Sequence, residues 1–424
     1  MLFVYKIFTF FFYPIFIILI YLRKIFNKED KSRFKEKIFP QYFLNERKKN
    51  KKLFWFHAAS IGEIQSILPL INKINKNHDN VEFLITTITL TSGNLFEKQF
   101  KDHPNIKHRY FPLDVNFLVK KFLNIWKPDL ILFVDSEIWP NFLNEIKNKS
   151  IPLVLLNGRI TKKTFIKWNL ISNTAKKIFS TFDLCLSSNK ESIKYLESFK
   201  AKNIKYLGNL KLSVEYKTNE LSLNNKEWFE KKRVWCALST HKGEDIFCLK
   251  THLELRKKNQ DLVTIIIPRH IDRVKEIGSI CKKLNLKYKI LSTNQDIDKE
   301  SEIIIINSYG TVSNYLKLCK SVLMGKSLIK KLESQSGQNP IEAAKHGCKI
   351  YHGPYVYNFQ EIYNLLSEFG ITELIKNETE LSNKLNLDLN NLGNVNKSNI
   401  DTINELGNKI LNNAYIELKK ISRL

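Results

Sequence analysis

Carboxylates follow two apolar segments in the first half of the chain. The string HAASIGE at residues 57–63 ends in Glu63, and the string VDSEIWPN at 134–141 contains Asp135 and Glu137. A carboxylate at the end of a strand can accept the proton of a hydroxyl group, and neighbouring carboxylates can push one another's pKa values apart. These acids therefore predict a site that carries out an acid–base step.

The same acids have a structural interpretation. Ser60-x-x-Glu63 is a capping box, in which the Glu63 carboxylate only returns a hydrogen bond to the start of a helix. Asp135 and Glu137 precede a Trp-Pro pair that begins a helix, where acids favour the positive end of the helix dipole. Both interpretations remain open at the level of sequence.

Side chains suited to a phosphate-bearing ligand occur in the second half. The string IIPRH places Arg269 after Pro268, where a guanidinium can bind a phosphate through paired hydrogen bonds, or can form only a surface ion pair. In GQNPIEAA, Asn339 is predicted at the N-cap, Pro340 at the first helical position and Glu342 at the third. Such a helix start presents free N–H groups to an anion, and its carboxylate can bind the hydroxyls of a ribose.

Other site chemistries lack their motifs. The triplet Gly325-Lys326-Ser327 lacks the upstream glycine of a P-loop, because position 320 is Lys. Asp296 and Asp298 lie in a predicted polar loop, and no His/Glu spacing suits a metal. The six cysteines are widely spaced, which favours buried thiols in a reducing compartment. We expect no metal and no cofactor.

The chain carries a formal charge of +26 and has a pI near 9.6. The excess is mostly Lys in a sequence that is also rich in Asn, Ile and Phe, which favours a compositional bias over a designed patch. None of the aromatic and basic motifs of nucleic-acid-binding modules occurs, so we expect no nucleic acid as a partner. The remaining charge suits an anionic membrane surface and a phosphorylated substrate.

Short apolar runs alternate with amphipathic stretches and predict two parallel sheets with helices, an α/β fold. The predicted strands are 53–57, 81–86, 130–134, 152–156, 184–187 and 205–207, and then 233–237, 262–267, 303–306, 321–323 and 349–352. A polar stretch at 213–226 is the predicted linker. The polar motifs follow strand ends, where open α/β sheets bind ligands, so we expect two Rossmann-like domains facing across a cleft, the glycosyltransferase B fold.

Residues 2–22 are almost wholly apolar, interrupted by Lys6 and Pro14. About 21 helical residues at 1.5 Å each would cross a hydrocarbon core of about 30 Å, which predicts a membrane-anchor helix. A cleaved signal peptide is the alternative, but no small-residue cleavage site follows. Twelve Lys or Arg lie between residues 23 and 52 against Lys6 alone on the other flank, so the body is predicted on the cytoplasmic side.

Taken together, the motifs resemble the Kdo transferases of lipopolysaccharide biosynthesis (glycosyltransferase family 30 type), where Kdo is 3-deoxy-D-manno-octulosonic acid. The matching strings run in order across most of residues 53–363: HAASIGE, EIWPN, LNGRI, GNLK, STHKGED, PRH, GQNPIEAA and GPYVYNF. The resemblance implies an inverting enzyme that moves Kdo from CMP-Kdo to a lipid A precursor, lipid IVA, without a metal. It implies a place at the bacterial inner membrane, among its anionic lipids.

The resemblance also implies that the two domains bind different substrates. After an anchor at 1–22, the domain at 23–215 would bind the acceptor, and the domain at 216–424, with a C-terminal helix, would bind CMP-Kdo. By position, Glu63 would be the proton acceptor, and Glu137 and Lys211 would stabilise the transition state. The implied CMP-binding residues are Pro268, Arg269, Gly310, Thr311, Val312, Asn339, Pro340, Ile341 and Glu342.

Two positions depart from the family pattern. The family usually has Asp-x-x-Gly-Glu where this chain has Asn307 to Thr311. A backbone grip through Gly310, Thr311 and Val312 would survive that change, whereas a carboxylate contact would not. The triplet Gly325-Lys326-Ser327 replaces a usual Gly-Gly-Ser and adds a cation.

Two rival interpretations remain. One is another membrane-associated glycosyltransferase B enzyme that uses a UDP-sugar, which a binding preference between CMP and UDP would separate. The other is a basic membrane-bound scaffold that binds anionic lipid or RNA without chemistry, and whose binding would be indifferent to Glu63.

Overall fold

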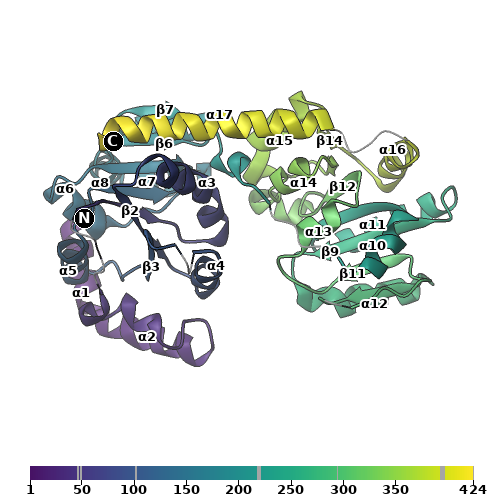
Figure 1. The fold of residues 1–424 in the computed structure, drawn as a ribbon, viewed down its shortest axis with the longest axis horizontal. Coiled ribbons are helices and arrows are strands. Elements are labelled where there is room, and N and C mark those ends of the chain that lie inside the picture. Colours follow the sequence, from purple (N-terminus) through teal and green to yellow (C-terminus); the bar gives the residue numbers. More distant parts are fainter. Residues whose placement is uncertain are drawn as a thin grey trace. The chain divides into compact units, whose positions relative to one another are not determined.

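The computed structural model describes residues 1–44, 47, 50–100, 103–216, 221–293, 295–391 and 397–423 (Figure 1). The chain forms two compact units: Met1–Val214 together with Leu406–Leu424, and Glu215–Glu405. The division predicted at residues 215 and 216 differs from these units in its last part, because it placed 406–424 in the second domain. Within the predicted linker, residues 217–220 lie outside the described residues.

The first unit is built on a parallel sheet of seven strands. Its central strands are buried on both faces, which is why their sequences are mostly apolar. Because all strands are parallel, their carboxyl ends share one edge of the sheet. From edge to edge, the strands are β3 (Ile106–Tyr110), β2 (Val81–Thr87), β1 (Lys52–His57), β4 (Leu130–Val134), β5 (Leu153–Gly158), β6 (Leu184–Ser187) and β7 (Ile204–Tyr206).

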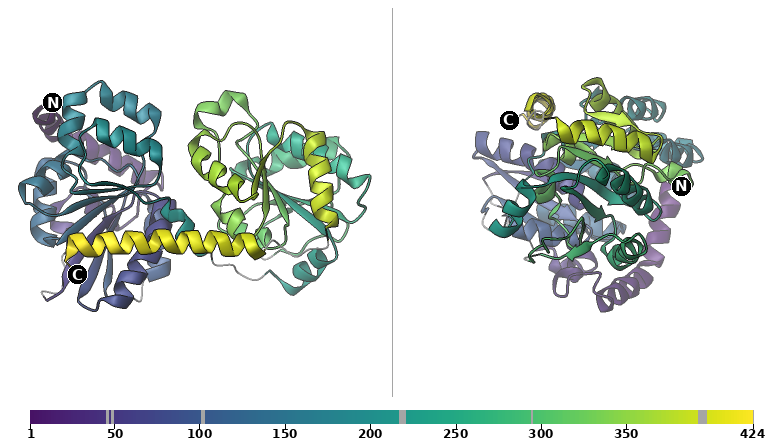
Figure 2. Two further views of the ribbon diagram at one scale, coloured as in Figure 1. Left: turned by 90° about the horizontal axis from the view of Figure 1, so that it is seen from above. Right: turned by 90° about the vertical axis from the view of Figure 1, so that its right-hand side faces the viewer.

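Helices cover both faces of this sheet (Figures 1 and 2). The core on one face packs around the fully buried rings of Trp55, Trp126 and Phe133. The helices are α1 (Leu2–Phe11), α2 (Tyr13–Ile25), α3 (Ile61–Asn77), α4 (Leu90–Phe100), α5 (Asn116–Trp126), α6 (Pro140–Asn148), α7 (Lys162–Asn169), α8 (Ser172–Phe179), α9 (Lys190–Ser198) and most of α17 (Lys397–Ser422), with 3-10 turns η1 (Arg33–Lys37), η2 (Pro40–Tyr42) and η3 (Leu210–Ser213).

The second unit repeats the plan with another parallel sheet of seven strands. From edge to edge, the strands are β10 (Tyr288–Leu291), β11 (Ile303–Ile306), β9 (Leu262–Pro268), β8 (Arg233–Thr240), β12 (Ser321–Met324), β13 (Lys349–His352) and β14 (Thr372–Leu374). The helices are α10 (Leu223–Glu230), α11 (Glu244–Arg256), α12 (Val274–Lys283), α13 (Val312–Leu316), α14 (Ile341–Lys345), α15 (Gln360–Glu368) and α16 (Glu378–Asn390), with 3-10 turns η4 (Ile271–Arg273), η5 (Lys330–Gln335) and η6 (Tyr357–Phe359).

The apolar N-terminal segment forms two helices, so the prediction of one continuous helix over 2–22 is wrong. α1 and α2 are bent by 58° at their junction. Pro14 lies in the first turn of α2, where it has no N–H to donate and its ring crowds the carbonyl one turn earlier. Among the described residues no single helix is both long and apolar enough to cross a membrane, whereas this bent pair passes on length and composition.

One side of α1 is polar and lies on the body of the first unit. The Tyr5 hydroxyl donates to the Asp114 carboxylate at 3.0 Å, and the Thr9 hydroxyl accepts from the Asn141 side-chain amide at 3.1 Å. Asp114 in turn accepts the backbone N–H groups of Asn141 and Phe142 at the start of α6. α1 is therefore bonded to the residues that begin α6.

α17 packs against the first unit along α3 and β7 (Figure 2). The His78 ring bonds to the Tyr415 hydroxyl at 2.9 Å, and Lys205 pairs with Glu417 at 2.5 Å. Gly407 comes so close to η3 that a Cβ there would lie 2.8 Å from the carbonyl carbon of Leu212. Glycine is therefore required where α17 crosses this turn.

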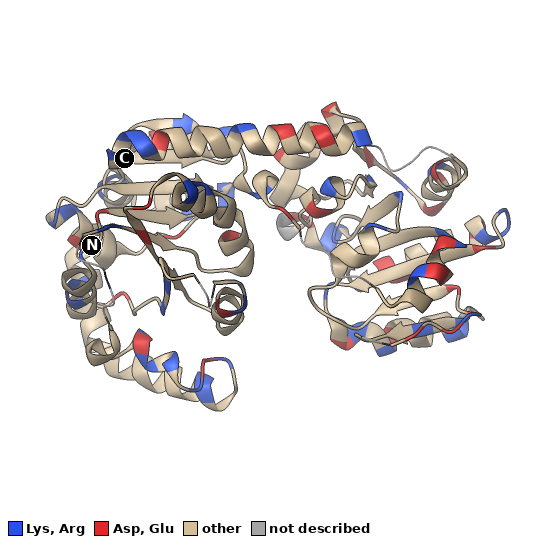
Figure 3. Cartoon of the chain, viewed as in Figure 1, with Lys and Arg blue, Asp and Glu red and all other residues tan. Residues whose placement is uncertain are grey.

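Lys and Arg are spread over helices and strand ends in each unit, and Asp and Glu lie between them (Figure 3). Many of the cations are in ion pairs with these acids, as in the pairs of Arg33 with Glu36 and of Lys349 with Glu373. This distribution agrees with a compositional origin of the positive charge.

Candidate active site

The strand order of the first unit reverses between β1 and β4, which are neighbours with His57 opposite Phe133. Ligands of open α/β sheets bind beside such a reversal, at the carboxyl ends of the strands. The HAASIGE segment follows β1, and the VDSEIWPN segment follows β4. The topology therefore brings Glu63 and Glu137 to the same part of the sheet edge.

Glu63 lies in the first turn of α3, with Ser60 as the N-cap. Its carboxylate accepts from the Ala59 backbone N–H at 2.8 Å and from the Ser60 hydroxyl at 2.7 Å. The capping interpretation is therefore correct as geometry. It does not remove the chemical one, because burial raises the pKa of Glu63 to about 7, with help from the charges of Asp135 and Glu137 and against the bonds from Ser60 and Ala59.

Glu137 is held by two ring donors on the same oxygen. Its Oε2 lies 3.2 Å from His57 Nε2 and accepts from Trp139 Nε1 at 2.8 Å. Burial alone would raise the pKa of Glu137, but the bonds from His57 and Trp139 outweigh it and the pKa is lowered. Glu137 is therefore a carboxylate at the pH where Glu63 titrates.

Lys211 enters the same area from η3. Its Nζ lies 3.9 Å from an oxygen of Asp135, and its Cε passes 4.0 Å from the place that a Cβ on Gly62 would occupy. Asp135 has a left-handed backbone with φ of 61°, which is uncommon for a residue other than glycine and occurs where the surroundings impose it. The structure thus gathers the three predicted residues Glu63, Glu137 and Lys211, and it adds Asp135.

This arrangement can perform proton transfer beside a fixed positive charge. A group with a pKa near 7 is suited to accept a proton at neutral pH, because it is partly ionised and still basic. The Lys211 ammonium can stabilise negative charge that develops near the base. Among the described residues, no group of three or more His, Cys, Asp or Glu side chains is arranged to hold a metal ion.

In the second unit the strand order reverses between β8 and β12, and Glu244 lies at that point. Its buried carboxylate accepts four backbone N–H groups. They belong to His241, Lys326, Ser327 and Leu328, at 2.7 to 3.1 Å. Glu244 therefore fixes the segment after β12 against the segment after β8.

The residues predicted for CMP binding fall into separate groups on the second unit. The Glu342 carboxylate accepts from the Ser313 hydroxyl at 2.6 Å, which joins the start of α14 to α13 and thus to Val312. Burial raises the pKa of Glu342. The preceding loop includes Thr311 and Gly310, whose φ of +77° suits glycine.

Arg269 follows β9, where Pro268 is the last strand residue, and its backbone N–H bonds to the Thr240 carbonyl at 3.1 Å. Arg269 is exposed, and its guanidinium pairs with no carboxylate of the described residues. The surface ion pair that the sequence left open is therefore absent from the described part of the chain. Arg269 is at the same sheet edge as Gly310 and Glu342, but no contact joins them in the described structure.

The predicted helix start at GQNPIEAA is shifted by one residue. Pro340 is the N-cap of α14, which begins at Ile341 and has five residues. Asn339 still performs the capping role, because its side-chain oxygen accepts from the Ile341 N–H at 3.2 Å. The prediction of Asn339 as N-cap is correct for the hydrogen bond and wrong for the boundary, as is common at helix ends.

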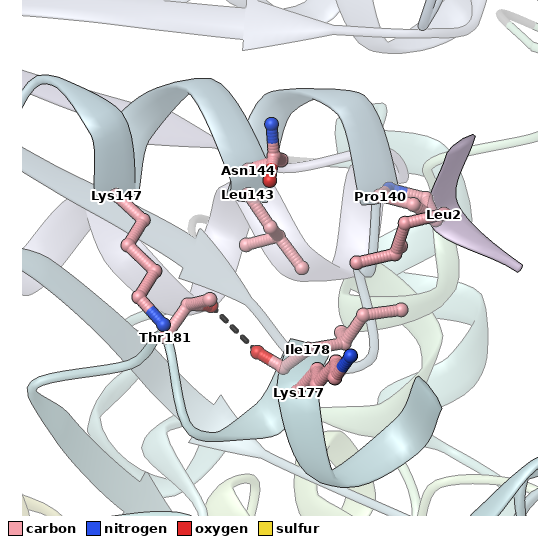
Figure 4. Close-up of a pocket in the computed structure, with 8 residues that line it drawn as sticks. All are labelled: Leu2, Pro140, Leu143, Asn144, Lys147, Lys177, Ile178 and Thr181. Atoms are coloured by element: carbon pink, nitrogen blue, oxygen red, sulfur yellow. Dashed lines mark hydrogen bonds between the residues drawn. The ribbon is translucent and has the colours of Figure 1, made fainter. Parts of the chain in front are cut away.

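A cavity of about 230 Å³ lies between α1, α6 and α8, away from these acids (Figure 4). Its lining combines apolar side chains with two lysines. The lining residues are Leu2, Pro140, Leu143, Asn144, Lys147, Lys177, Ile178 and Thr181. None of them is Asp, Glu or His, so the lining lacks the carboxylates of the candidate site.

Sequence reasoning missed the roles of His57 and Glu244. A histidine at the end of the otherwise apolar strand KLFWFH was a signal, because a fully buried imidazole needs partners for both nitrogens. Glu244 in STHKGED was quoted only as part of a motif, although an acid in the first turn of a helix at a strand end is placed to bind neighbouring N–H groups.

Comparisons with known proteins point to one enzyme family. Residues 32–214 match the family model described as 3-deoxy-D-manno-octulosonic-acid transferase (kdotransferase). A 3-deoxy-D-manno-octulosonic acid transferase of Rickettsia bellii is 30% identical over 392 residues, which cover 91% of each chain. The chain belongs to the Kdo transferase family. The corresponding transferase of Haemophilus influenzae is 27% identical over 76% of this Kdo transferase chain and 75% of its own.

Solved structures support the fold of this Kdo transferase family member. The structure of a glycosyltransferase from Rickettsia africae aligns with 88% of this chain over 99% of its own length, at 12% identity and a TM-score of 0.56. The structure of a UDP-GlcNAc 2-epimerase from Neisseria meningitidis aligns with 88% of this chain over 99% of its own length, at 14% identity and a TM-score of 0.55. With two parallel sheets of seven strands, the chain has the glycosyltransferase B fold, as predicted.

Proposed function

We propose that this member of the Kdo transferase family transfers Kdo from CMP-Kdo to a hydroxyl of the lipid A precursor lipid IVA, with inversion, in lipopolysaccharide inner-core biosynthesis. The observation that carries the proposal is the group formed by Glu63, Glu137 and Lys211 at the strand reversal of the first unit, where the pKa of Glu63 is about 7. A family-typical base with a pKa near neutrality suits deprotonation of a sugar hydroxyl.

In the proposed step, a Glu63 oxygen accepts the proton of the acceptor hydroxyl while the hydroxyl oxygen attacks the anomeric carbon of Kdo. The bond from that carbon to the CMP phosphate oxygen breaks, and CMP leaves with the bonding electrons. One bond forms on the face opposite the leaving group, so the configuration inverts. Lys211 stabilises negative charge near the reacting carbon, and Glu137 stabilises the positive charge that develops on the sugar ring.

We assign CMP binding to the second unit. Arg269 is exposed at the end of β9, where its guanidinium can bind the CMP phosphate through two hydrogen bonds. The Glu342 carboxylate, bonded to Ser313, is suited to bind ribose hydroxyls. The Gly310, Thr311 and Val312 backbone contributes N–H groups, which compensates for the missing family acid at Thr311.

We also propose that the enzyme works on the cytoplasmic face of a bacterial inner membrane, in contact with anionic lipids. Phe3 and Phe11 of α1 are 73% and 71% exposed, and Ile25 and Phe26 at the end of α2 are 71% and 69% exposed. Exposed large apolar side chains along two successive helices are typical of a membrane interaction site. The basic stretch at 23–52 would then lie at the lipid headgroups.

The proposal is tested with purified protein, in situ generated CMP-Kdo and tetra-acylated lipid IVA, read by mass spectrometry. A gain of one or more Kdo masses is the expected result, and the size of the gain counts the transfers. Parallel reactions with UDP-sugars are expected to give no product. Transfer from a UDP-sugar, or no transfer from folded protein with CMP-Kdo, would contradict the proposal.

A further inference from the structure

His57 is a fully buried imidazole at the carboxyl end of β1, and both of its nitrogens have partners. Nε2 lies 3.2 Å from Oε2 of Glu137. On the other side, Nδ1 lies 3.0 Å from the hydroxyl and 3.2 Å from the carbonyl oxygen of Thr86. The imidazole therefore connects the second strand of the sheet to a carboxylate of the candidate site.

The direction of these hydrogen bonds follows from their partners. An ionised Glu137 can only accept, so Nε2 carries a hydrogen. The Thr86 hydroxyl accepts from Trp55 Nε1 at 2.9 Å, which leaves its own hydrogen free for His57 Nδ1. If Nδ1 instead donates to the Thr86 carbonyl, the ring is an imidazolium, and Nε2 still carries a hydrogen. His57 is a donor to Glu137 in either state.

Packing holds the imidazole in this orientation. The ring of Phe111 stacks on it with centroids 3.7 Å apart and planes at 19°. Phe133 packs edge-on, with centroids 5.5 Å apart. A ring enclosed in this way cannot rotate without displacing its neighbours, so the Nε2–H bond keeps pointing toward Glu137.

The hydrogen bonds to Glu137 converge on one of its oxygens. His57 and Trp139 both bond to Oε2, and no described residue donates to Oε1. Its side chain is 17% exposed. Binding through a single oxygen fixes the carboxylate while it leaves the other oxygen available to a ligand.

We propose that His57 is a positioning residue, which fixes Oε2 of Glu137 through Nε2–H so that Oε1 faces the reacting groups. This inference rests on the proposed function, because it assigns Oε1 to the sugar being transferred. It adds a task for a residue that touches neither substrate.

Charged groups surround Glu137, and the charge of Glu137 affects the pKa of the proposed base, Glu63. Glu63 of α3, Asp135 of the same loop and Lys211 of η3 surround it, and Arg159 after β5 acts on Asp135. The charge of Glu137 is one of the causes that raise the pKa of Glu63. Loss of the His57 hydrogen bond would allow Glu137 to hold a proton to higher pH, and would lower the pKa at which Glu63 becomes a base.

The test uses two replacements in the full-length protein. His57→Met keeps the volume and removes the donor, whereas His57→Gln retains an N–H close to the position of Nε2. We expect His57→Met to lower kcat about 10- to 100-fold with an unchanged KM for CMP-Kdo, because a small misplacement of a reacting group has that effect. The ascending limb of its kcat–pH profile should move to lower pH. His57→Gln should recover most of the activity and the wild-type profile.

The chain supplies a matched control in His252. This histidine is equally buried and bonds to the Thr264 hydroxyl at 2.8 Å, and it faces Glu302 at 3.5 Å, but it lies in the second unit. His252→Met should lower the free energy of unfolding and leave kcat and its pH profile unchanged. If it alters the profile as His57→Met does, the inference is overturned.

The background variant Glu137→Gln tests whether His57 acts through Glu137. In that background, His57→Met should have little further effect on kcat, and additive losses would overturn the inference. If His57→Met does not fold, Trp139→Phe removes the other donor to Oε2 and should shift the pH profile in the same direction. An unshifted profile would contradict the proposal.

Failure of the proposed function is recognised separately. If the wild type transfers no Kdo, the proposed function fails. The double-mutant cycle of His57 and Glu137 is then read in the free energy of unfolding. Coupling between the two changes supports the hydrogen bond, and additive changes overturn it.

Discussion

At the scale of single residues, Glu63 holds a carboxyl group where its charge is unfavourable. Burial raises its pKa to about 7 from the ordinary glutamate value of 4.5. Between these pH values the folded state binds a proton that the unfolded state has lost. The raised pKa therefore destabilises the folded protein increasingly as the pH rises from about 4.5 to 7, and by a constant amount above that.

The first prediction concerns activity. Glu63→Gln removes the proposed proton acceptor but keeps a side chain that can accept from the Ala59 N–H. We expect kcat to fall about 100- to 10,000-fold, the usual contribution of a general base, and the wild-type rise of kcat through pH 7 to disappear. CMP affinity, measured by titration calorimetry, should not change. Near-normal turnover would contradict the assignment.

The second prediction concerns stability of the same variant. Because Gln carries no charge, Glu63→Gln should be more stable than the wild type at pH 8, with little difference at pH 4.5. In a unit of this size each 1 kcal/mol corresponds to about 2 to 4 °C in Tm. Thermal unfolding at the two pH values checks this expectation, and equal Tm differences at both would contradict it.

A third prediction at this scale concerns Glu244. In Glu244→Gln, an NH2 group must replace one oxygen and face two backbone N–H donors, because each carboxylate oxygen accepts two. We expect a loss of about 3 kcal/mol in the free energy of unfolding of the second unit and weaker CMP binding. Urea unfolding and calorimetry measure both.

The control for this change is Glu276→Gln, whose side chain is 41% exposed in surface pairs with Lys242 and Arg273. It should cost less than about 1 kcal/mol. Equal losses for the two variants would show that the four N–H groups at Glu244 do not matter.

The sequence predicted the acids and the lysine of the first unit, because their motifs follow apolar strands directly. Their hydrogen bonds were not predictable. His57 and Glu137 are 80 positions apart in the chain, and only the pairing of β1 with β4 brings them together. The left-handed backbone of Asp135 was equally hidden, since Asp tolerates but does not require it.

At the scale of elements, η3 depends on α17. A helix interior normally favours Ala over Gly by about 1 kcal/mol. At Gly407, however, a Cβ would overlap the backbone of Leu212, the residue after Lys211. The turn that carries Lys211 would have to move.

We therefore predict that Gly407→Ala lowers both the Tm and kcat, although alanine has a higher helix propensity than glycine. The affinity for CMP should be retained. Asn408→Ala is the control, because Asn408 is exposed on the same turn of α17 and alanine also has a higher helix propensity than asparagine. It should be neutral or slightly stabilising. Thermal unfolding and the transfer assay compare the two, and similar behaviour would exclude a role for the close contact.

Three strands, β3, β10 and β14, were absent from the sequence prediction, and each lies at an edge of its sheet. Edge strands are covered less completely, so their sequences are less apolar: β3 alternates buried with partly exposed residues, and β10 has one buried residue. The eleven predicted strands include all the central ones, whose burial requires apolar runs. Pro14 marks the bend after α1, but because proline is tolerated in the first turn of a helix, its presence alone did not predict a bend.

At the scale of the whole molecule, the second unit is one continuous stretch, whereas the first is completed by a segment that follows it. We predict that a fragment of residues 215–405 folds alone and binds CMP. A fragment of 1–214 should melt at a lower temperature than the first unit of the full chain, since Lys205 and His78 lose their α17 partners.

Circular dichroism and calorimetry on the two fragments check this prediction. A synthetic peptide of residues 397–423, added in trans, should raise the Tm of fragment 1–214. A fragment 1–214 that is unaffected by the peptide and as stable as the intact unit would contradict it.

The interrupted first unit also has a consequence for synthesis on the ribosome. α17 is translated only after residues 215–405, which takes roughly 10 to 40 seconds at about 5 to 20 residues per second. During that interval α1 and α2 have already emerged with their aromatic side chains, while Gly208 and η3 have no helix against them. The nascent chain can thus reach the proposed membrane surface first, and the turn that carries Lys211 gains its support only after the entire second unit has been made.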